Sequence, residues 1–409
     1  MNDFGVTRSP RTVVFGMGQR GALGRAASQA GRAALVCTDQ RLSAEPAFAA
    51  MMDNLKSNGV AVRVYDRTLA ELPLSCVDEA LRHASGFGAD VVIGIGGGSC
   101  MDLAKVVALL LTHGGHPRDY YGEFKVPGQV TPIVAVPTTA GTGSEVTPVA
   151  VLGDPERAMK VGISSPYLIA HTAICDPELT LTCPPALTAV SGADALTHAI
   201  EAFTAIERPA APTLAYEHVF VGKNALSDTY ALQAIRLLSR FLPTAVRNGG
   251  DEAARVAVMR GALFAGLAFG TAGTAAAHAI QYPVGALTHT PHGAGVAQLM
   301  PYVMAFNRPT CPAAMAAIAR AMDVAADQSE EELSRAAVTA VAELFASINI
   351  PKTLAAIGLT ADQIDWTTEQ SLASQRLIKN NPRPLDTSAL KAIINAAFRG
   401  DLAESLSRP

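Results

Sequence analysis

The chain has 409 residues, and its 32 Lys and Arg residues against 36 Asp and Glu residues give a formal net charge of -4. This length predicts two or three domains, and a composition of 49% hydrophobic and 17% charged residues excludes an intrinsically disordered protein. The mild acidity argues against a general nucleic-acid binder, so we expect a small-molecule partner and no nucleic acid.

The start of the chain and its cysteines favour a reducing cytoplasm. Residues Met1–Arg8 lack the basic and apolar regions of a secretory signal, and the six cysteines are scattered without a CxxC motif. The longest stretch without charged residues or histidine, Gly261–Ala277, is rich in Gly and Ala. It is shorter than the roughly 20 strongly apolar residues that a membrane span requires. We therefore expect a buried helix there and no membrane association.

In the first half of the chain, β-branched runs alternate with amphipathic stretches, which predicts a mostly parallel sheet covered by helices. The predicted strands are Thr12–Phe15, Ala34–Thr38, Val60–Tyr65, Asp90–Ile95, Pro132–Val136 and Val146–Leu152. The predicted helices between the first four strands are Leu23–Ala30, Phe48–Lys56 and Val77–Ser85. Ser75 followed by Asp78 predicts a capping box at the start of the third helix. This α/β domain is expected to cover residues 1–184 and to end at the pair Pro184–Pro185.

Beyond this proline pair the strand signal fades, and apolar residues recur at the three- and four-residue spacing of helices. The predicted helices are Ala186–Phe203, Leu226–Phe241, Glu252–Phe269, Ala313–Met322, Glu330–Ile348 and Ser388–Phe398. The stretch Glu207–Asn224 is poorly patterned and is predicted to be a long surface loop. The sequence therefore predicts an all-helical second domain over residues 185–409.

Two glycine-rich loops in the first half compete as dinucleotide-binding sites. The first, Gly16–Gly21, follows a strand and opens a helix, and Asp39 lies 21 residues after Gly18. This spacing is typical of the dinucleotide-binding fingerprint. The N–H groups of the loop would face a pyrophosphate, and Asp39 would accept hydrogen bonds from the adenosine ribose. An ordinary turn between a strand and a helix is the alternative interpretation.

The second loop, Gly96–Ser99, also follows a strand and opens a helix, with Asp102 in its first turn and Lys105 one turn later. Three consecutive glycines allow a bulky anion to approach the main chain, and the helix dipole favours its negative charge. A third loop, Thr138–Glu145, follows the strand Pro132–Val136 and supplies hydroxyl groups. Loops at the carboxyl ends of parallel strands commonly line ligand clefts, so this loop is expected near the ligand.

One carboxylate and three imidazoles in the second half form a set that can bind a divalent metal. Asp194 and His198 are four residues apart in a predicted helix and project from one face of it. His278 is placed at the end of the small-residue helix, and His292 follows fourteen residues later. A surface or capping pair is the alternative interpretation of Asp194 and His198. The absence of cysteine from the set favours a catalytic site over a structural zinc site.

Together, these loops and histidines resemble those of the iron-containing, or group III, alcohol dehydrogenases. This family is related in fold to dehydroquinate synthase and glycerol-1-phosphate dehydrogenase. The resemblance runs from about Val13 to Arg399. Its specific pieces, in the order and spacing of the family, are Gly96–Ser99 with Asp102 and Lys105, Pro137–Glu145, Asp176–Pro177, Gly192–Phe203 and His278–Gly293.

The resemblance implies a homodimeric enzyme that transfers a hydride between NAD and a primary alcohol, or an aldehyde in reverse. It implies a metal site for Fe²⁺ or Zn²⁺ formed by Asp194, His198, His278 and His292. It also implies that NAD binds between the two domains with its pyrophosphate on Gly97–Ser99, which leaves Gly16–Gly21 as a structural turn. The implied dinucleotide contacts are Asp39, Gly97, Gly98, Ser99, Asp102, Thr138, Thr139, Thr142, Ser144 and Lys160. The carboxylate of Asp39 would repel the 2′-phosphate of NADP.

Two positions depart from the pattern of the family. Cys100 stands where a proline usually follows the glycines, which leaves the backbone donors available. Tyr282, four residues after His278, stands where many members carry a histidine thought to pass the alcohol proton to solvent. A phenol with an ordinary pKa near ~10 is a poorer proton shuttle at neutral pH. His289 is a second candidate for this role or a solvated loop histidine, and Phe269 is a substrate-pocket wall by resemblance or a core aromatic.

Three other functions stay open from the sequence. The first is a hydroxyacid-oxoacid transhydrogenase, or a specialised aldehyde or oxo-acid reductase, of the same family. The second is a metal-dependent lyase or cyclase on the dehydroquinate synthase-like fold. The third is a non-catalytic binding protein, which the coincidence of a complete metal-ligand set with the nucleotide loops disfavours. The sequence identifies neither the substrate nor the metal.

Overall fold

The computed structural model describes residues 4–157, 160–324 and 328–407. The chain divides into two compact units. Unit 1 comprises Met1–Thr7, Pro184–Ala215 and Phe220–Pro409, and unit 2 comprises Arg8–Cys183 and Tyr216–Val219. Apart from two short segments, the chain therefore passes from unit 2 to unit 1 at the proline pair.

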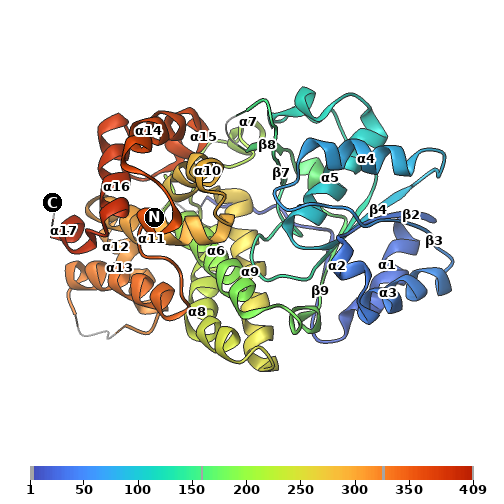
Figure 1. The fold of residues 1–409 in the computed structure, drawn as a ribbon, viewed down its shortest axis with the longest axis horizontal. Helices are drawn as coiled ribbons and strands as arrows, with labels where there is room; N and C mark the ends of the chain where they lie inside the picture. The colour runs from blue at the N-terminus through green and yellow to red at the C-terminus, as the bar shows by residue number, and fades with distance from the viewer. Residues whose placement is uncertain (1–3, 158–159, 325–327, 408–409) are drawn as a thin grey trace. The chain divides into compact units, whose positions relative to one another are not determined.

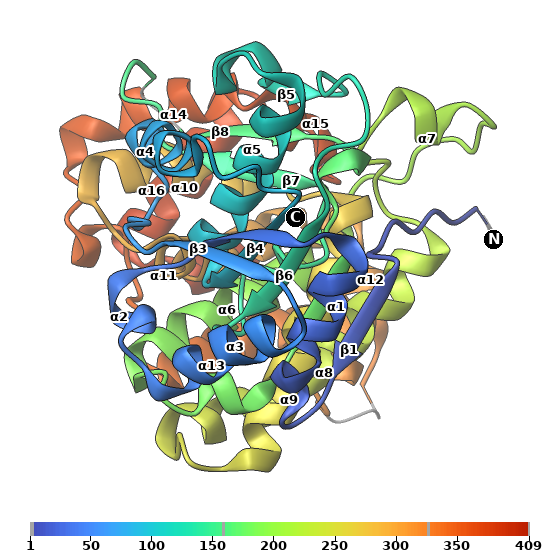
Figure 2. The same cartoon turned by 90° about the vertical axis from the view of Figure 1, so that its right-hand side faces the viewer.

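Unit 2 is built on a six-stranded sheet in which every pair of neighbouring strands is parallel (Figure 2). In spatial order the strands are β1 (Thr12–Phe15), β9 (Thr172–Cys175), β6 (Ile133–Pro137), β4 (Val91–Gly96), β2 (Ala33–Cys37) and β3 (Ala61–Tyr65). The central strands β2, β4 and β6 are almost entirely buried. Such continuous apolar strands occur where helices cover both faces of a parallel sheet. The predicted parallel sheet is confirmed.

Helices form one layer on each face of this sheet. They are α1 (Leu23–Ala30), α2 (Gln40–Ser43), α3 (Pro46–Ser57), α4 (Leu74–Ala84) and α5 (Gly98–His113). Leu35 of β2 belongs to the core shared with α4 and α5, while its neighbour Val36 belongs to the core shared with α1 and α3. This alternation follows from the two-residue repeat of a strand. Figure 2 shows α1 and α3 on one side of the strands and α4 and α5 on the other.

Two details of the sequence prediction for unit 2 are wrong. The predicted strand Val146–Leu152 is extended only over β7 (Val149–Leu152), and β7 is not part of the parallel sheet. It pairs antiparallel with β8 (Val161–Ser164), which pairs in parallel with β5 (Gly122–Glu123). The capping box predicted at Ser75 is also absent, because α4 starts at Leu74, so Ser75 lies inside the helix and Pro73, the N-cap, makes no side-chain hydrogen bond.

All regular secondary structure among the described residues of unit 1 is helical (Figure 1). Its main helices are α6 (Pro185–Thr204), α8 (Ala225–Arg247), α9 (Glu252–Ala272), α10 (Ala276–Thr288), α11 (His292–Asn307), α12 (Pro312–Ala321), α13 (Glu330–Ser347), α14 (Ile364–Ala373), α15 (Gln375–Asn380), α16 (Thr387–Arg399) and α17 (Leu402–Ser407). The central helix α6 packs against α8, α9 and α11. An α/β unit joined to a helical unit is therefore confirmed as the fold class.

The small-residue stretch Gly261–Ala277 does not form one helix, which corrects the prediction. α9 ends at Ala272, and Gly273 adopts a φ of 83° in the left-handed region that favours glycine. The next helix, α10, begins at Ala276, so His278 lies in its first turn and not at the end of the preceding helix. The break gives His278 its own helix N-terminus.

Two further stretches, Glu207–Asn224 and α9, bear on the sequence predictions. Glu207–Asn224 is mostly irregular, as predicted, but it contains the short helix α7 (Leu214–Glu217) and a buried segment around Phe220. By length and composition, α9 could cross a membrane, but 78% of its apolar window is buried inside the protein. That burial is typical of the core helix of a globular unit.

Candidate metal centre and nucleotide loops

Three of the four side chains predicted as metal ligands, Asp194, His278 and His292, lie close together in unit 1, and the fourth, His198, lies beside Asp194. Oδ1 of Asp194 is 3.8 Å from Nε2 of both His198 and His278, and 3.9 Å from Nε2 of His292. Four atoms bound at about 2.0–2.2 Å around a tetrahedral centre lie about 3.3–3.6 Å apart. The ligand atoms of Asp194, His278 and His292 all lie within 4.8 Å of one another, so these three side chains form a group that could hold a metal ion.

Three helices position these side chains. Asp194 and His198 lie one turn apart on α6, His278 lies on α10, and His292 is the first residue of α11. The start of α11 approaches α6 closely at Gly293, where a Cβ atom would lie 2.2 Å from the backbone oxygen of Val190. Only glycine fits this approach, which brings His292 within reach of α6.

The chemistry of these side chains fits a divalent transition metal. Asp194, His198 and His278 are buried, while the side chain of His292 is 24% exposed. Nε2 of His278 is buried and has no hydrogen-bond partner among the described residues. A buried polar atom without a hydrogen-bond partner destabilises the protein, and a ligand bound to that atom removes this cost. Imidazole and carboxylate are suitable ligands for both iron and zinc.

A carboxylate that was not predicted also supports this centre. Glu201, on α6, lies 2.6 Å from Nδ1 of His278, and its side chain is only 1% exposed. It is seven residues after Asp194 and three after His198, so it lies on the same face of α6. This spacing is visible in the sequence, but the partner of Glu201 depends on where α10 begins.

Two aromatic rings contact the histidines. The ring of Phe269 stacks on His198 with centroids 4.0 Å apart and planes at 11°, and Phe269 is buried. The ring of Tyr282 stacks on His292 with centroids 6.1 Å apart. His289 is exposed at the C-cap of α10, where its backbone has a φ of 56°. Of the three residues predicted on the substrate side, two therefore pack against ligand candidates.

The first glycine loop of unit 2 is held by a buried carboxylate. The backbone N–H of Gly18 donates to Oδ1 of Asp176 at 3.0 Å, and the N–H of Arg20 donates to Oδ2 at 2.9 Å. The guanidinium of Arg20 also pairs with this carboxylate. The donors that a pyrophosphate would need are thus already engaged, so Gly16–Gly21 forms a structural turn. The role of Asp176 was not visible from the sequence, which shows only its place in a family motif.

The second glycine loop has a different environment. Gly97 is the N-cap of α5 and, as a glycine, has no side chain with which to cap the helix. The first N–H groups of a helix have no acceptor within the helix. The third predicted loop packs beside it, since a Cβ on Gly98 would lie 2.8 Å from Cγ2 of Thr142. Thr139 also lies next to Gly97. The structure therefore brings these predicted residues together around a helix N-terminus suited to an anion.

Behind this loop, three polar side chains hold one another. The Ser144 hydroxyl donates to Oδ1 of Asp102 at 2.6 Å and accepts from Nζ of Lys105 at 2.9 Å. Lys105 also donates to the backbone oxygens of Thr147 and Val149. Burial lowers the pKa of Lys105 to about 8, although Asp102 and Glu145 oppose this shift. The hydrogen-bonding capacity of the Ser144 hydroxyl is thus used largely within the protein.

The remaining predicted nucleotide residues lie near the same loop. Oδ1 of Asp39 caps α2 by accepting the N–H of Leu42 at 2.9 Å. Burial, and then the nearby charge of Asp39, raise the pKa of the Cys100 thiol to about 12. Lys160 forms an ion pair with Glu71. Two others, Ser99 and Thr138, lie at the start of α5 and at the end of β6 respectively, and the hydroxyl of Thr138 is buried.

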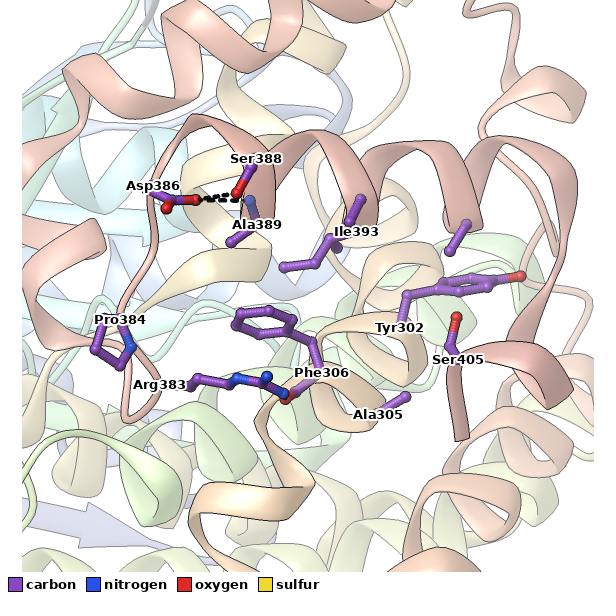
Figure 3. A pocket seen from close by; sticks show the side chains of 12 residues that line it. Tyr302, Ala305, Phe306, Arg383, Pro384, Asp386, Ser388, Ala389, Ile393 and Ser405 are labelled. Carbon is purple, nitrogen blue, oxygen red and sulfur yellow. Dashed lines mark hydrogen bonds between the residues drawn. The ribbon is translucent and has the colours of Figure 1, made fainter. Parts of the chain in front are cut away.

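Unit 1 also contains a pocket of about 380 Å³ that is separate from the metal ligands (Figure 3). It lies at the C-terminal half of α11, where the guanidinium of Arg383 lies 4.5 Å from the ring centroid of Phe306. At its rim, Asp386 accepts a hydrogen bond from the N–H of Ala389 and caps α16. Tyr302 in this pocket is about 15 Å along α11 from His292. The pocket therefore includes none of the predicted site residues.

Sequence profiles of one family match most of the chain. The profile described as iron-containing alcohol dehydrogenase matches residues 10–177. The profile described as the C-terminal part of the Fe-containing alcohol dehydrogenase family matches residues 188–398. The first match contains both glycine loops, and the second contains all four predicted metal ligands.

Individual proteins are similar to this chain over almost its whole length. Long-chain-alcohol dehydrogenase 1 of Geobacillus thermodenitrificans (strain NG80-2) is 38% identical over 374 residues, which cover 90% of each chain. The crystal structure of a 1,3-propanediol oxidoreductase has a TM-score of 0.90 at 31% identity and covers 97% of this chain and 100% of that chain. A sulfoacetaldehyde reductase from Bifidobacterium kashiwanohense, solved in complex with NAD⁺, has a TM-score of 0.82 at 27% identity, covering 96% and 98%.

Proposed function

Because the chain belongs to the iron-containing alcohol dehydrogenase family, we propose that it transfers a hydride between a primary alcohol and NAD. In the reverse direction it would reduce an aldehyde with NADH. The observation that carries this proposal is the cluster in unit 1, in which Oδ1 of Asp194 lies 3.8–3.9 Å from three imidazole nitrogens.

The proposed metal is Fe²⁺ or Zn²⁺, held by Asp194, His198, His278 and His292. When bound, the cation supplies Lewis-acid stabilisation of the negative charge that develops on the substrate oxygen. A single carboxylate only partly neutralises a divalent charge, so Asp194 leaves the site the positive charge that this chemistry needs. The affinity of such ligands for zinc exceeds that for iron, so the supply of each metal decides which one is bound.

We propose that unit 2 binds the dinucleotide. The N–H groups of Gly97, Gly98 and Ser99 donate hydrogen bonds to the pyrophosphate of the dinucleotide. Thr138, Thr139 and Thr142 lie beside these groups. The carboxylate of Asp39 accepts hydrogen bonds from the adenosine ribose, which favours NAD over NADP. Asp102, Ser144 and Lys160 act behind this surface and fix the loops that form it. A relative solved with NAD⁺ supports this choice of cofactor.

On the substrate side, each aromatic residue has a distinct proposed role. Phe269 holds the ring of His198 in place by stacking on it. Tyr282 lies against His292, the partly exposed ligand candidate, and is the proposed hydrogen-bond donor to the alcohol oxygen. His289 is exposed seven residues further on and is the proposed proton acceptor toward solvent. A neutral imidazole can accept a proton near pH 7, whereas a phenol mainly donates.

We further propose that the enzyme works in the cytoplasm as a homodimer. None of its six cysteines, all within the described residues, forms a disulfide, which suits a reducing compartment. The homodimer follows from the family resemblance, and size-exclusion chromatography with light scattering would test it. A monomer at micromolar concentration would contradict it.

A metal-reconstitution assay tests the proposed function. Protein stripped with a chelator is reloaded with Fe²⁺ or Zn²⁺ and offered primary alcohols, aldehydes and hydroxy acids with NAD or NADP, while nicotinamide absorbance is followed. We expect metal-dependent, NAD-preferring oxidation of at least one primary alcohol. Coupled turnover of a hydroxy acid and an oxo acid on a retained nicotinamide would indicate a transhydrogenase instead. Turnover without any net redox change would indicate a lyase or cyclase.

A further inference from the structure

Glu201 joins two of the helices that carry the metal ligands. Its Oε2 accepts the N–H of Ala275 at 2.9 Å and lies 2.6 Å from Nδ1 of His278. Its Oε1 accepts the N–H of Ala277 at 2.7 Å. The carboxylate is on α6, and all three of its partners are at the start of α10. It is therefore a buried group with one bond to a ligand candidate and two bonds to the helix that carries this ligand.

The bonds to the backbone explain how a carboxylate is tolerated at this depth. Ala275 is the N-cap of α10 and has no side-chain cap of its own, so Glu201 supplies the cap from another helix. The N-terminus of a helix carries partial positive charge, which stabilises an ionised carboxylate there. An ionised carboxylate can only accept hydrogen bonds, so Nδ1 of His278 must be the donor in their contact.

We propose that Glu201 is a positioning residue for the metal centre: it keeps His278 in the tautomer that has its proton on Nδ1. Nε2 then keeps its lone pair and faces Asp194 at 3.8 Å. A carboxylate behind a ligating histidine also makes the imidazole a better ligand. This inference rests on the metal centre of the proposed function and adds a residue to it.

A purely structural role is the alternative, in which Glu201 only caps α10. Two features separate the roles. The bond to His278 is the shortest of the three, and it involves a side chain that capping does not require. The chain also offers a structural control. Asn380, on α15, fixes the adjacent link between α9 and α10 by donating to the backbone oxygens of Ala272 and Thr274, and neither of these bonds involves a ligand candidate.

The main experiment compares metal affinity in the variants Glu201→Gln and Asn380→Leu. Gln has nearly the shape of Glu but has no charge, and in either orientation its amide NH₂ meets at least one backbone N–H. Dissociation constants for Zn²⁺ and Co²⁺ are measured on the apoprotein by competition with a chromophoric chelator, and the apoprotein Tm is recorded. We expect Glu201→Gln to weaken metal binding about 10- to 100-fold. Asn380→Leu should lower the Tm and leave the dissociation constant within about twofold of wild type.

A second measurement does not depend on metal. In apoprotein with ¹⁵N-labelled histidine, NMR shifts of the ring nitrogens should report an Nδ1–H tautomer for His278 in wild type and in Asn380→Leu. In Glu201→Gln we expect a larger share of the Nε2–H tautomer.

The outcomes separate the inference from the function on which it rests. If Glu201→Gln binds metal as tightly as wild type, or if Asn380→Leu weakens metal binding equally, the positioning role is wrong while the metal centre stands. If wild-type protein itself binds neither Zn²⁺ nor Co²⁺, the metal centre of the proposed function fails and the inference fails with it.

Discussion

The metal cluster of unit 1 and the glycine loops of unit 2 use polar side chains in opposite ways. In unit 1, the ligand atoms of Asp194, His278 and His292 lie within 4.8 Å of one another, and a buried nitrogen of His278 has no hydrogen-bond partner among the described residues. In unit 2, the side chains of Asp102, Ser144 and Lys105 bond to one another behind the loop. At the N-terminus of α5, the groups proposed to meet the ligand are backbone N–H groups.

This difference indicates which groups, side chains or main chain, would bind the ligand in each unit. In the proposed function, the helical site depends on side chains, because its imidazole and carboxylate ligands are side-chain groups. The proposed pyrophosphate site depends on main-chain donors of the glycine loop, and the polar side chains of Asp102, Ser144 and Lys105 hold the neighbouring segments in place. Substitutions should therefore remove activity in unit 1, but in unit 2 they should mostly remove stability.

The largest expected effect is that of His278→Ala. Losing one imidazole removes the metal, and with it about 4 kcal/mol of transition-state stabilisation, so kcat/KM for alcohol oxidation should fall at least about a thousandfold. The far-UV circular dichroism spectrum should stay that of the wild type. His113→Ala, which removes a partly buried imidazole at the C-terminal end of α5 in unit 2, is the control and should keep full activity. A fully active His278→Ala enzyme would rule out the proposed metal centre.

The second largest effect is that of Ser144→Ala, which tests whether the polar side chains behind the glycine loop of unit 2 serve stability. Removing the hydroxyl leaves the buried groups of Asp102 and Lys105 each short of a hydrogen bond, so the free energy of unfolding should fall by about 1–3 kcal/mol. The KM for NAD should change by less than about threefold. Urea unfolding and steady-state kinetics measure the two quantities.

A matched variant sharpens this test. Thr139 lies beside Gly97 and is only partly buried, so Thr139→Ala should raise the KM for NAD and change the unfolding free energy little. If Ser144→Ala instead raises the KM about tenfold or more without loss of stability, Ser144 contacts the cofactor directly, and the contrast between the two units is weaker than proposed.

The sequence predicts much of this architecture because its signals are local. The buried runs of β2 and β4 and the amphipathic helix α1 follow from apolar periodicity, and α1 was predicted with its observed bounds. The glycines before α5 mark a helix N-terminus by composition alone. Asp194 and His198 fall on one face because four residues make about one helical turn.

The parts that could not be predicted depend on contacts between distant segments. The break at Gly273 is hidden in a uniform run of small residues, and without it His278 was placed at the wrong end of a helix. Asp176 accepts a hydrogen bond from Gly18, and Glu201 contacts His278; in both pairs the residues are more than seventy positions apart in the sequence. Short strands such as β9 (Thr172–Cys175) carry too few residues for a periodic signal.

The smallest expected effect concerns Asp39, whose carboxylate the proposal places in contact with the adenosine ribose of the cofactor. Asp39 also caps α2 through Leu42, so removing it outright would mix two effects. Asn is as good an N-cap as Asp, and Asp39→Asn therefore removes the charge and keeps the helix. Without that charge, the 2′-phosphate of NADP meets less repulsion.

We expect Asp39→Asn to raise the ratio of kcat/KM for NADP to that for NAD about tenfold, since one unit of charge near a phosphate is worth about 1–4 kcal/mol. The Tm should stay unchanged, whereas Asp39→Ala should lower stability by about 1 kcal/mol through the lost cap. Asp53→Asn removes the same charge from the exposed face of α3 and should leave the ratio as in wild type. If the ratio of kcat/KM for NADP to that for NAD is unchanged in Asp39→Asn, Asp39 acts only as the N-cap of α2 and does not contact the ribose. The other side chains predicted to contact the nucleotide would then have to be tested for a purely structural role.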